Sequence, residues 1–234
     1  HYPPGYPALI SGVLVFSDSI VAVKLLSGLF LFGSIIISYL LLTRFTESYI
    51  FSFVINLLVV FNSHALFYGS LMMSEVPYMF FSLLALYFCT KFQKIEKKTL
   101  VVVIGMLLSM VVAYYVRSLG VALLAGICLH FLLHKNYKMM IISISGLIIG
   151  GLPWFIRGQS LGGTSYMNQL KMINPYNPGM GEASFSDFIE RFWSNFSRYV
   201  TREIPDAVFN YGPGYNDPIS GSEWLFGIVF LVVI

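Results

Sequence analysis

Long apolar stretches and short polar segments alternate along the chain, and this pattern predicts membrane-spanning helices. Crossing about 30 Å of hydrocarbon takes about 20 consecutive apolar residues. Six complete apolar stretches come near that length, although the fifth is short, and they occupy residues 19–43, 49–70, 72–92, 99–116, 119–133 and 139–156. A seventh stretch begins at Trp224. The pattern therefore predicts an all-α fold, a polytopic transmembrane helix bundle.

Residues 158–222 are instead rich in Gly, Pro, Asn and Tyr and hold most of the acidic residues, so they predict a polar segment in water or at the interface. Within it, Ser184 followed by Asp187 is typical of a helix start. Apolar residues then recur at steps of three and four, which predicts one apolar helix face, formed by Phe188, Ile189, Phe192, Trp193, Phe196, Tyr199 and Val200. Two interpretations of this helix stay open: it packs on a soluble domain, or it lies on the bilayer surface.

These patterns divide the chain into three regions. Residues 1–157 are predicted to form a transmembrane core, with a Pro-rich opening loop, a short surface helix and about six spans. Residues 158–222 form an extracytoplasmic or interfacial segment, and residues 223–234 start a further transmembrane helix. Because the chain starts at His1 and stops at Ile234 within an apolar run, we expect it to be a piece of a longer protein.

Composition excludes a soluble globular domain. The chain is 57% hydrophobic and 11% charged, and its mean hydropathy is +0.76; soluble domains are about 45–50% apolar and about 25% charged. The isoelectric point near 8.8 reflects Lys and Arg in short loops, so it indicates topology rather than nucleic-acid binding. Alternation through the spans puts Arg44, residues 91–98, Lys135 and Lys138 on one side, which the positive-inside rule makes cytoplasmic. The polar segment is then extracytoplasmic.

Glu75 is a candidate for chemistry because ionisable residues near a membrane are costly and are usually placed for function. It lies in Ser74-Glu-Val-Pro77, at the extracytoplasmic mouth of a span, and Pro77 suits a first helical turn. A carboxylate there can bind a cation or a sugar hydroxyl, or simply cap the helix. His64 and Tyr68 precede it on the same side, which adds them to the candidates for a substrate cavity.

Arg117 and Arg157 fall on the same side as Glu75. A guanidinium at the mouth of a helix bundle can hold a phosphate with two hydrogen bonds, as a lipid-phosphate donor would need. The alternative for both residues is an interfacial anchor beside aromatic rings.

The opening loop supplies the remaining candidates. His1 and Tyr2 precede Pro3-Pro-Gly-Tyr-Pro7, and we expect Tyr2 and Tyr6 to line the substrate cavity. His1 can ligate a metal, so a divalent metal ion is the one cofactor that the sequence suggests. The sequence contains no Gly-rich phosphate loop, no CxxC pair and no HExxH motif.

Five blocks, in consistent order over residues 1–157, resemble the dolichyl-phosphate-mannose protein mannosyltransferase-like superfamily of C-type membrane glycosyltransferases, which also contains the aminoarabinose transferases. The blocks are Tyr2-Pro-Pro-Gly-Tyr-Pro-Ala-Leu, Val23-Lys-Leu-Leu-Ser-Gly-Leu, Leu71-Met-Met-Ser-Glu-Val-Pro, Arg117-Ser-Leu-Gly and Leu152-Pro-Trp-Phe-Ile-Arg157.

The resemblance implies a multi-pass enzyme, of the bacterial inner membrane by expectation, with an extracytoplasmic active site. It implies transfer of a sugar from a polyprenyl-phosphate donor to a hydroxyl of a protein, lipid or glycan acceptor. The catalytic aspartate of the family would lie before His1. Glu75 matches the family's second acidic position, whereas His1 and Tyr2 stand where aminoarabinose transferases have a metal-binding glutamate and a phosphate-contacting lysine.

On this hypothesis, Glu75 takes part in catalysis, and Arg117 and Arg157 stabilise the leaving phosphate. The alternative is a transporter or flippase without enzymatic activity, because such proteins are also polytopic and line a path with charges. The candidate charges lie at one mouth, which favours chemistry at the membrane surface.

Overall fold

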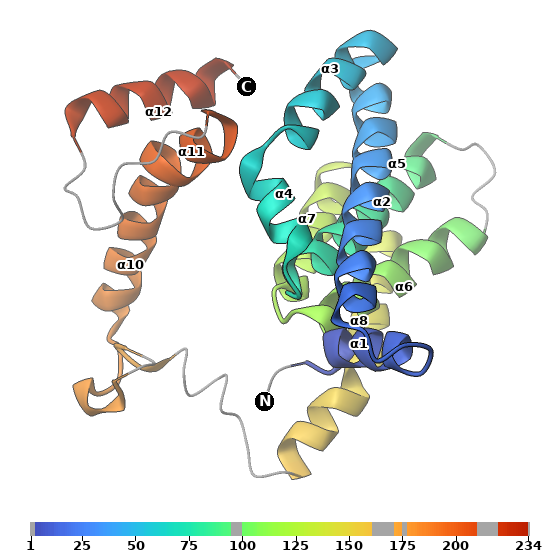
Figure 1. Ribbon diagram of the computed structural model, residues 1–234. Coiled ribbons are helices and arrows are strands. Elements are labelled where there is room, and N and C mark those ends of the chain that lie inside the picture. Colours follow the sequence, from blue (N-terminus) through green and yellow to red (C-terminus); the bar gives the residue numbers. More distant parts are fainter. Residues whose placement is uncertain (1–2, 95–99, 161–170, 175–176, 210–219, 234) are drawn as a thin grey trace. The chain divides into compact units, whose positions relative to one another are not determined.

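We describe a computed structural model of the chain, which covers residues 3–94, 100–160, 171–174, 177–209 and 220–233 (Figure 1). The described residues are almost entirely helical, with one isolated antiparallel bridge between Met172 and Glu182. The all-α prediction is therefore confirmed for this part of the chain. Internal contacts divide the chain into two units, residues 1–61 with 65–162, and residues 62–64 with 163–234.

The first unit contains the N-terminal helices. They are α1 (Gly5–Leu14), α2 (Ile20–Thr46), α3 (Tyr49–Val60), α4 (Ser63–Ser70, whose first two residues group with the second unit), α5 (Glu75–Lys94), α6 (Leu100–Val116), α7 (Gly120–Leu133) and α8 (Tyr137–Ser160). The second unit contains the 3₁₀ turn η1 (Pro178–Met180), α10 (Phe185–Arg198), the π-helical turn η2 (Tyr199–Glu203), α11 (Ile204–Phe209) and α12 (Gly221–Val233).

Two described helices are long and apolar enough to cross a membrane: α2, and the part of α8 from Tyr137 to Gly158. A third span is formed if α3 and α4 count together, but these two helices meet at a bend of 61°. The other predicted spans fall short, because α6 and α7 have 17 and 14 residues and α5 carries polar residues at both ends. The structure is compatible with a membrane protein of two or three spans by this measure, fewer than the six that the apolar stretches predict.

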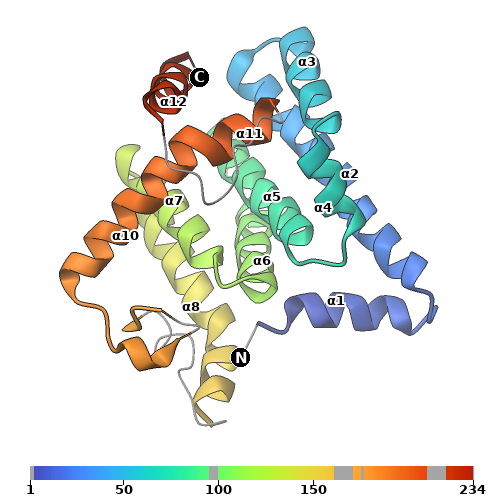
Figure 2. The ribbon, with the colours of Figure 1, turned by 60° about the vertical axis from the view of Figure 1, so that its left-hand side comes forward.

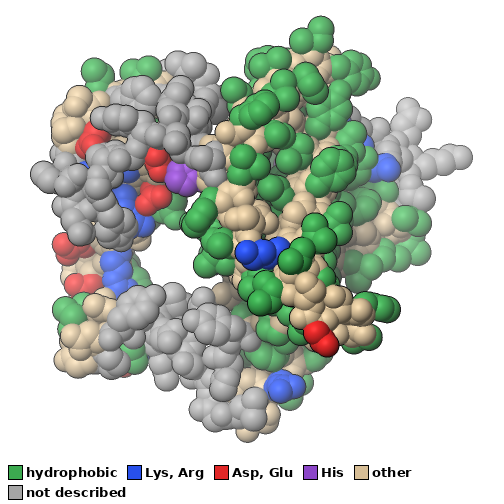
Figure 3. Space-filling view, in the orientation of Figure 1, with side chains coloured by type: hydrophobic (Ala, Val, Ile, Leu, Met, Phe, Trp, Pro, Cys, Tyr) green, Lys and Arg blue, Asp and Glu red, His purple; other side chains and the backbone are tan. Residues whose placement is uncertain are grey.

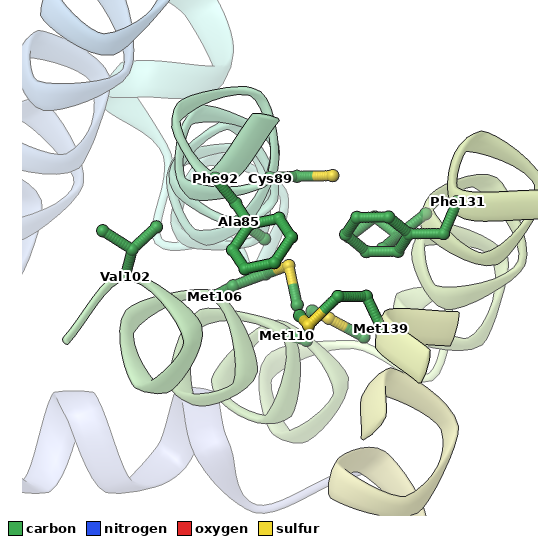
Figure 4. Close-up of a cluster of buried hydrophobic side chains, with 9 residues drawn as sticks. Ala85, Cys89, Phe92, Val102, Met106, Met110, Phe131 and Met139 are labelled. Atoms are coloured by element: carbon green, nitrogen blue, oxygen red, sulfur yellow. The ribbon is translucent and has the colours of Figure 1, made fainter. Parts of the chain in front are cut away.

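The core of the first unit lies where α5, α6, α7 and the start of α8 meet. Figure 4 shows the buried side chains that form it: Ala85, Cys89, Phe92, Val102, Met106, Met110, Phe131 and Met139, with Ile127 completing the cluster. Three of these are methionines, whose unbranched side chains fill irregular gaps between helices. Phe92 and Phe131 meet edge to face, with ring centroids 6.1 Å apart. This core fixes the relative positions of the four helices.

Small residues bring α2 close to α5. A Cβ at Gly33 would lie 2.6 Å from the Phe80 ring, so only glycine permits this approach. Buried serines on several helices return their hydroxyls to the carbonyl four residues earlier, as Ser34 does to Phe30 and Ser143 does to Met139, each at 2.8 Å. Small residues and internally satisfied hydroxyls at helix contacts are typical of membrane bundles, where unpaired polar groups are costly.

Apolar side chains also cover much of the outer surface of the first unit. Figure 3 shows green side chains over α2 and α3. The exposed apolar residues of these two helices include Val21, Leu25, Leu29, Phe32, Ile50, Phe53 and Leu58. A helix that is apolar on every side is suited to a lipid environment or to a larger protein core. The exposed residues of α2 thus agree with its assignment as a candidate span.

The second unit is built on the turn between α10 and α12. Gly227 of α12 packs against the backbone of Val200 in η2, which leaves no room for a Cβ. Buried Arg202 lies 3.8 Å from Glu223, and the same carboxylate oxygen accepts a hydrogen bond of 2.7 Å from the Ser220 backbone N–H. One acidic side chain therefore caps α12 and ties it to η2. The described part of the region predicted to start a further span, residues 223–233, lies within this unit in α12.

Candidate functional site

Glu75 and Arg117 meet at one end of the first unit. Oε1 of Glu75 lies 2.6 Å from Nη1 of Arg117, and both side chains are about one-third exposed. Glu75 is the first residue of α5, where the positive end of the helix dipole favours a carboxylate. Pro77 and Val76 follow as buried residues, so the backbone beside the carboxylate is held by packing. The carboxylate and the guanidinium are thus held in contact with each other, and both remain partly exposed.

The turn that carries Arg117 is held from three directions. The turn connects α6 to α7, and the backbone carbonyl of Arg117 accepts a hydrogen bond of 3.0 Å from the Gly120 N–H. A Cβ at Gly120 would lie 2.5 Å from Cα of Tyr114, so the turn closes only with glycine. The Tyr78 hydroxyl donates to the carbonyl of Leu119 at 3.1 Å, and the Tyr115 hydroxyl donates to the carbonyl of Gly150 at 2.9 Å. These contacts link α5, α6, α7 and α8 around Arg117.

Tyr6 of α1 lies at the same end of the bundle. Gly5 packs against the end of α6, because a Cβ there would lie 2.5 Å from the carbonyl carbon of Tyr115 (Figure 2). The Tyr6 hydroxyl is buried and, among the described residues, has no hydrogen-bond partner of good geometry. Burial raises the pKa of the phenol most, the neighbouring Ser27 hydroxyl lowers it in part, and the Glu75 charge raises it by less than either; the net shift of the pKa is upward. The hydroxyl is therefore a neutral donor beside Glu75.

Arg157 and Tyr68 each interact with an aromatic neighbour of their own helix rather than with Glu75 or Arg117. The Arg157 guanidinium lies 5.9 Å from the centre of the Trp154 ring, one turn earlier in α8, and the side chain is exposed. Tyr68 is also exposed and makes an edge contact with Phe67, with ring centroids 5.6 Å apart. The stacking of Arg157 is typical of an interfacial anchor, the second of its two predicted roles.

His64 belongs to the second unit. Its Nε2 lies 3.0 Å from Oδ2 of Asp206 in α11. The structure therefore gives His64 an acidic partner that the sequence did not suggest.

His1 and Tyr2 lie outside the described residues. The predicted metal site at His1 and the predicted cavity contact of Tyr2 can therefore not be placed. In the part of the chain that the structure describes, no three His, Cys, Asp or Glu side chains gather in a way that could hold a metal ion.

Three residues of the site were missed from the sequence. Tyr78 stands three residues after Glu75 on the same helix face, and that spacing could have shown it. Gly120 belongs to the Arg117-Ser-Leu-Gly block, but its close approach to Tyr114 depends on how α6 and α7 pack. Ser27 is buried in α2 and reaches Tyr6 only through the tertiary fold.

The arrangement at this end of the bundle can bind an anion with hydroxyl groups attached. A guanidinium has five N–H donors and the contact with one carboxylate oxygen uses few of them, so Arg117 keeps donors for a phosphate. Glu75 accepts hydrogen bonds, and Tyr6 donates one. A phosphorylated sugar presents the matching groups: phosphate oxygens for Arg117 and hydroxyls for Glu75.

Comparisons with protein-family models, with curated proteins and with solved structures give no match to this chain.

Proposed function

We propose that the chain is part of a membrane glycosyltransferase that moves a sugar from a polyprenyl-phosphate donor to an acceptor hydroxyl on the extracytoplasmic face. The observation that carries the proposal is the contact of 2.6 Å between Glu75 and Arg117, at a surface-open end of an apolar bundle. The lipid chain of such a donor would lie beside apolar helices, and its phosphate would reach the one guanidinium that is paired with a carboxylate there.

The proposed reaction exchanges one bond at the anomeric carbon. The acceptor oxygen forms a bond to that carbon, the bond from the carbon to the phosphate oxygen breaks, and the electron pair leaves with the lipid phosphate. Arg117 stabilises the phosphate as its charge develops. The acceptor proton needs a base, which the resemblance puts ahead of His1, so the proposal assigns no base within this chain.

Glu75 has two roles in this proposal. Its carboxylate orients the Arg117 guanidinium, since an ion pair at 2.6 Å restricts the rotation of the side chain. Its second oxygen is available for a hydroxyl of the sugar or acceptor, or for a cation. Tyr6, with a buried hydroxyl that lacks a good partner among the described residues, would donate to the same ligand.

The test is sugar transfer by the full-length natural protein in lipid vesicles, with a panel of radiolabelled polyprenyl-phosphate sugars. We expect Arg117→Ala to lower transfer at least about 100-fold, as loss of one transition-state donor does. Lys138→Ala is the matched control, because Lys138 is an exposed cation at the start of α8 and should leave transfer unchanged. Transfer at the wild-type rate by Arg117→Ala would contradict the proposal.

The Tyr6→Phe variant tests whether the Tyr6 hydroxyl contributes to ligand binding or to the stability of the fold. The hydroxyl makes no hydrogen bond of good geometry among the described residues, so its removal should leave the unfolding temperature unchanged or higher. If the hydroxyl contacts the donor, the KM for the donor rises. An unchanged KM would remove Tyr6 from the site.

A transporter or flippase is the second candidate, and one observation favours it. The bend of 61° between α3 and α4 breaks a candidate span, and Asn56 is buried in α3 with a side-chain oxygen that accepts no hydrogen bond from any described residue. Broken helices with polar groups at membrane depth are typical of transporters. Uptake of solute into sealed vesicles, together with no turnover of any lipid-linked sugar, would favour this candidate over the transferase.

A further inference from the structure

The apolar face of α10 is a well-formed helix surface rather than a collapsed segment. Ser184 and Asp187 form a capping box: the Ser184 N–H donates to the Asp187 carboxylate at 2.6 Å, and the Asp187 N–H donates to the Ser184 hydroxyl at 3.4 Å. Seven exposed apolar side chains at helical spacing form a surface that we call the α10 face: Phe185, Phe188, Ile189, Phe192, Trp193 and Phe196 of α10, and Tyr199 at the start of η2. Val200, which the sequence pattern also assigned to this face, is instead buried beside Gly227.

The α10 face has no cover within the described structure. None of the residues of α10 is buried. Phe185 is 80% exposed, Phe192 61% and Trp193 60%. Several of the rings contact one another, as in the stacked pair of Phe192 and Phe196 with centroids 6.2 Å apart. The guanidinium groups of Arg191 and Arg198 lie 5.5 Å and 5.9 Å from the ring centres of Phe188 and Tyr199. Contiguous exposed apolar surface of this kind marks an interaction site.

A candidate membrane span precedes the α10 face in the sequence, which indicates that a bilayer lies within reach of this face. α10 begins at Phe185, 25 residues after Ser160, where the candidate span α8 ends. A short tether to a membrane-embedded helix keeps α10 at a high effective concentration near the lipid surface. Trp and Tyr are the side chains that favour the headgroup level, and the α10 face carries Trp193 and Tyr199.

Charge indicates which lipid surface fits. Residues 163–234 contain four Lys and Arg against seven Asp and Glu, a net formal charge of −3; they are Lys171, Arg191, Arg198, Arg202, Glu182, Asp187, Glu190, Glu203, Asp206, Asp217 and Glu223. A segment of this charge gains nothing from anionic headgroups. Binding must therefore come from the rings, and a zwitterionic bilayer is sufficient.

We propose that α10 is a membrane-surface anchor, which lies in the plane of the bilayer with the α10 face at the boundary between headgroups and acyl chains. Asp187, Glu190, Arg191 and Arg198 then lie on the water side. The anchor holds the second unit at the lipid surface, and it does not depend on sugar transfer, since a transporter could carry it equally well.

Fluorescence quenching of Trp193 tests the anchor in the full chain. The chain has three tryptophans, so Trp154→Phe with Trp224→Phe leaves Trp193 as the only emitter. We reconstitute this variant in phosphatidylcholine vesicles whose acyl chains carry bromine either near the headgroup or near the chain end. We expect quenching several-fold stronger by the bromine near the headgroup, and a blue-shifted emission maximum.

The matched control moves the emitter to the polar face. Ser194→Trp in a Trp193→Phe background should show little quenching by either lipid and strong quenching by aqueous iodide, because Ser194 lies opposite the α10 face on the helix. Substitutions in α10 open no core, because none of its residues is buried, and far-ultraviolet circular dichroism checks that both variants are folded. Replacing one third of the lipid with phosphatidylglycerol should leave the quenching of Trp193 unchanged.

Equal quenching at the two positions would overturn the proposal. A Trp193 that is shielded from both bromine and iodide, in a protein that sediments as a dimer, would assign the α10 face to a second copy of the chain and would also overturn it. A Trp193 quenched by iodide alone would show a face that stays in water.

Discussion

The two units use apolar residues in opposite ways. In the first unit apolar side chains both fill the core and cover the outside of α2 and α3, so the rare charges stand out, and two of them, Glu75 and Arg117, meet at one end. In the second unit polar groups cap and tie the helices, and the apolar α10 face is the unpaired feature. The comparison teaches that the residues informative about function are those that contrast with their own surroundings.

The largest expected effect is a difference in the free energy of unfolding when one large apolar side chain is truncated in each of the two units. Met106→Ala opens a cavity in the core of the first unit, where Met106 is 1% exposed, and should lower the free energy of unfolding by about 2–5 kcal/mol. Phe192→Ala in the α10 face should change it by less than about 0.5 kcal/mol in detergent. Chemical unfolding of both variants in mild detergent checks this. Equal losses would mean that α10 is packed and not exposed.

Two glycines of α7 give a second comparison, between a tightly packed position and an open one. Gly120→Ala drives a Cβ into the backbone of Tyr114 and should cost about 1–3 kcal/mol of stability. Gly126→Ala, also in α7, meets nothing within 4 Å and should be neutral or slightly stabilising, since alanine favours the helix. Thermal unfolding of the two variants measures the difference. If Gly120→Ala were tolerated as well as Gly126→Ala, the turn that carries Arg117 would not be closed as described.

The capping box tests the second unit. Ser184→Ala removes a capping hydroxyl and should cost about 1 kcal/mol of helix stability, whereas Ser194→Ala in the middle of α10 should cost almost nothing. Circular dichroism against denaturant distinguishes the two.

Lowering the pH should weaken the same N-terminal cap of α10. Hydrogen bonds from the hydroxyl and backbone N–H of Ser184 lower the pKa of Asp187 below 3.8. A lowered folded-state pKa means that the cap stabilises α10 above pH 3.8 and that this stabilisation is lost as the pH falls below it. Asp187→Asn should remove this acid step, which circular dichroism between pH 5 and pH 2 can follow. An acid step of the same size in Asp187→Asn would assign it to another group.

The smallest effect on stability should come from the Glu75–Arg117 pair. Both side chains are about one-third exposed, so water screens the ion pair and Glu75→Gln should cost at most about 1 kcal/mol. The same variant should lower sugar transfer by the full-length protein far more than it lowers stability, because the carboxylate orients Arg117. A large loss of stability with normal transfer would make the pair a structural contact.

The apolar pattern predicted the helices well, and two or three of the described helices are candidate spans by length and composition. The stretch at residues 19–43 is α2, and Ser184 with Asp187 does start α10. The stretch at residues 49–70 contains a break at Phe61 and Asn62, between the end of α3 at Val60 and the start of α4 at Ser63. Short polar residues favour such turns, but hydrophobicity summed over a window hides them. Counting apolar stretches therefore gives more candidate spans than helix length and composition do within the described residues.

The candidate site was only partly predictable. Assigning residues to sides of the membrane put Glu75 and Arg117 at the same end, because that assignment depends only on alternation through the apolar stretches. Their contact depends on how α5, α6 and α7 pack, and so do the positions of Tyr78 and Gly120. His64 was expected near Glu75 from its place in the sequence, but the contact with Asp206 groups it with the second unit.

Binding of polyprenyl phosphate tests the central claim most directly, because it needs neither the sugar nor the acceptor to be known. Radiolabelled polyprenyl phosphate is titrated into the purified full-length protein, its Arg117→Ala variant and the Lys138→Ala control. Charge-assisted hydrogen bonds contribute about 1.5–3 kcal/mol, so Arg117→Ala should raise the Kd about 10- to 100-fold, while Lys138→Ala leaves it unchanged. Equal Kd values for all three proteins would contradict a phosphate site at Arg117.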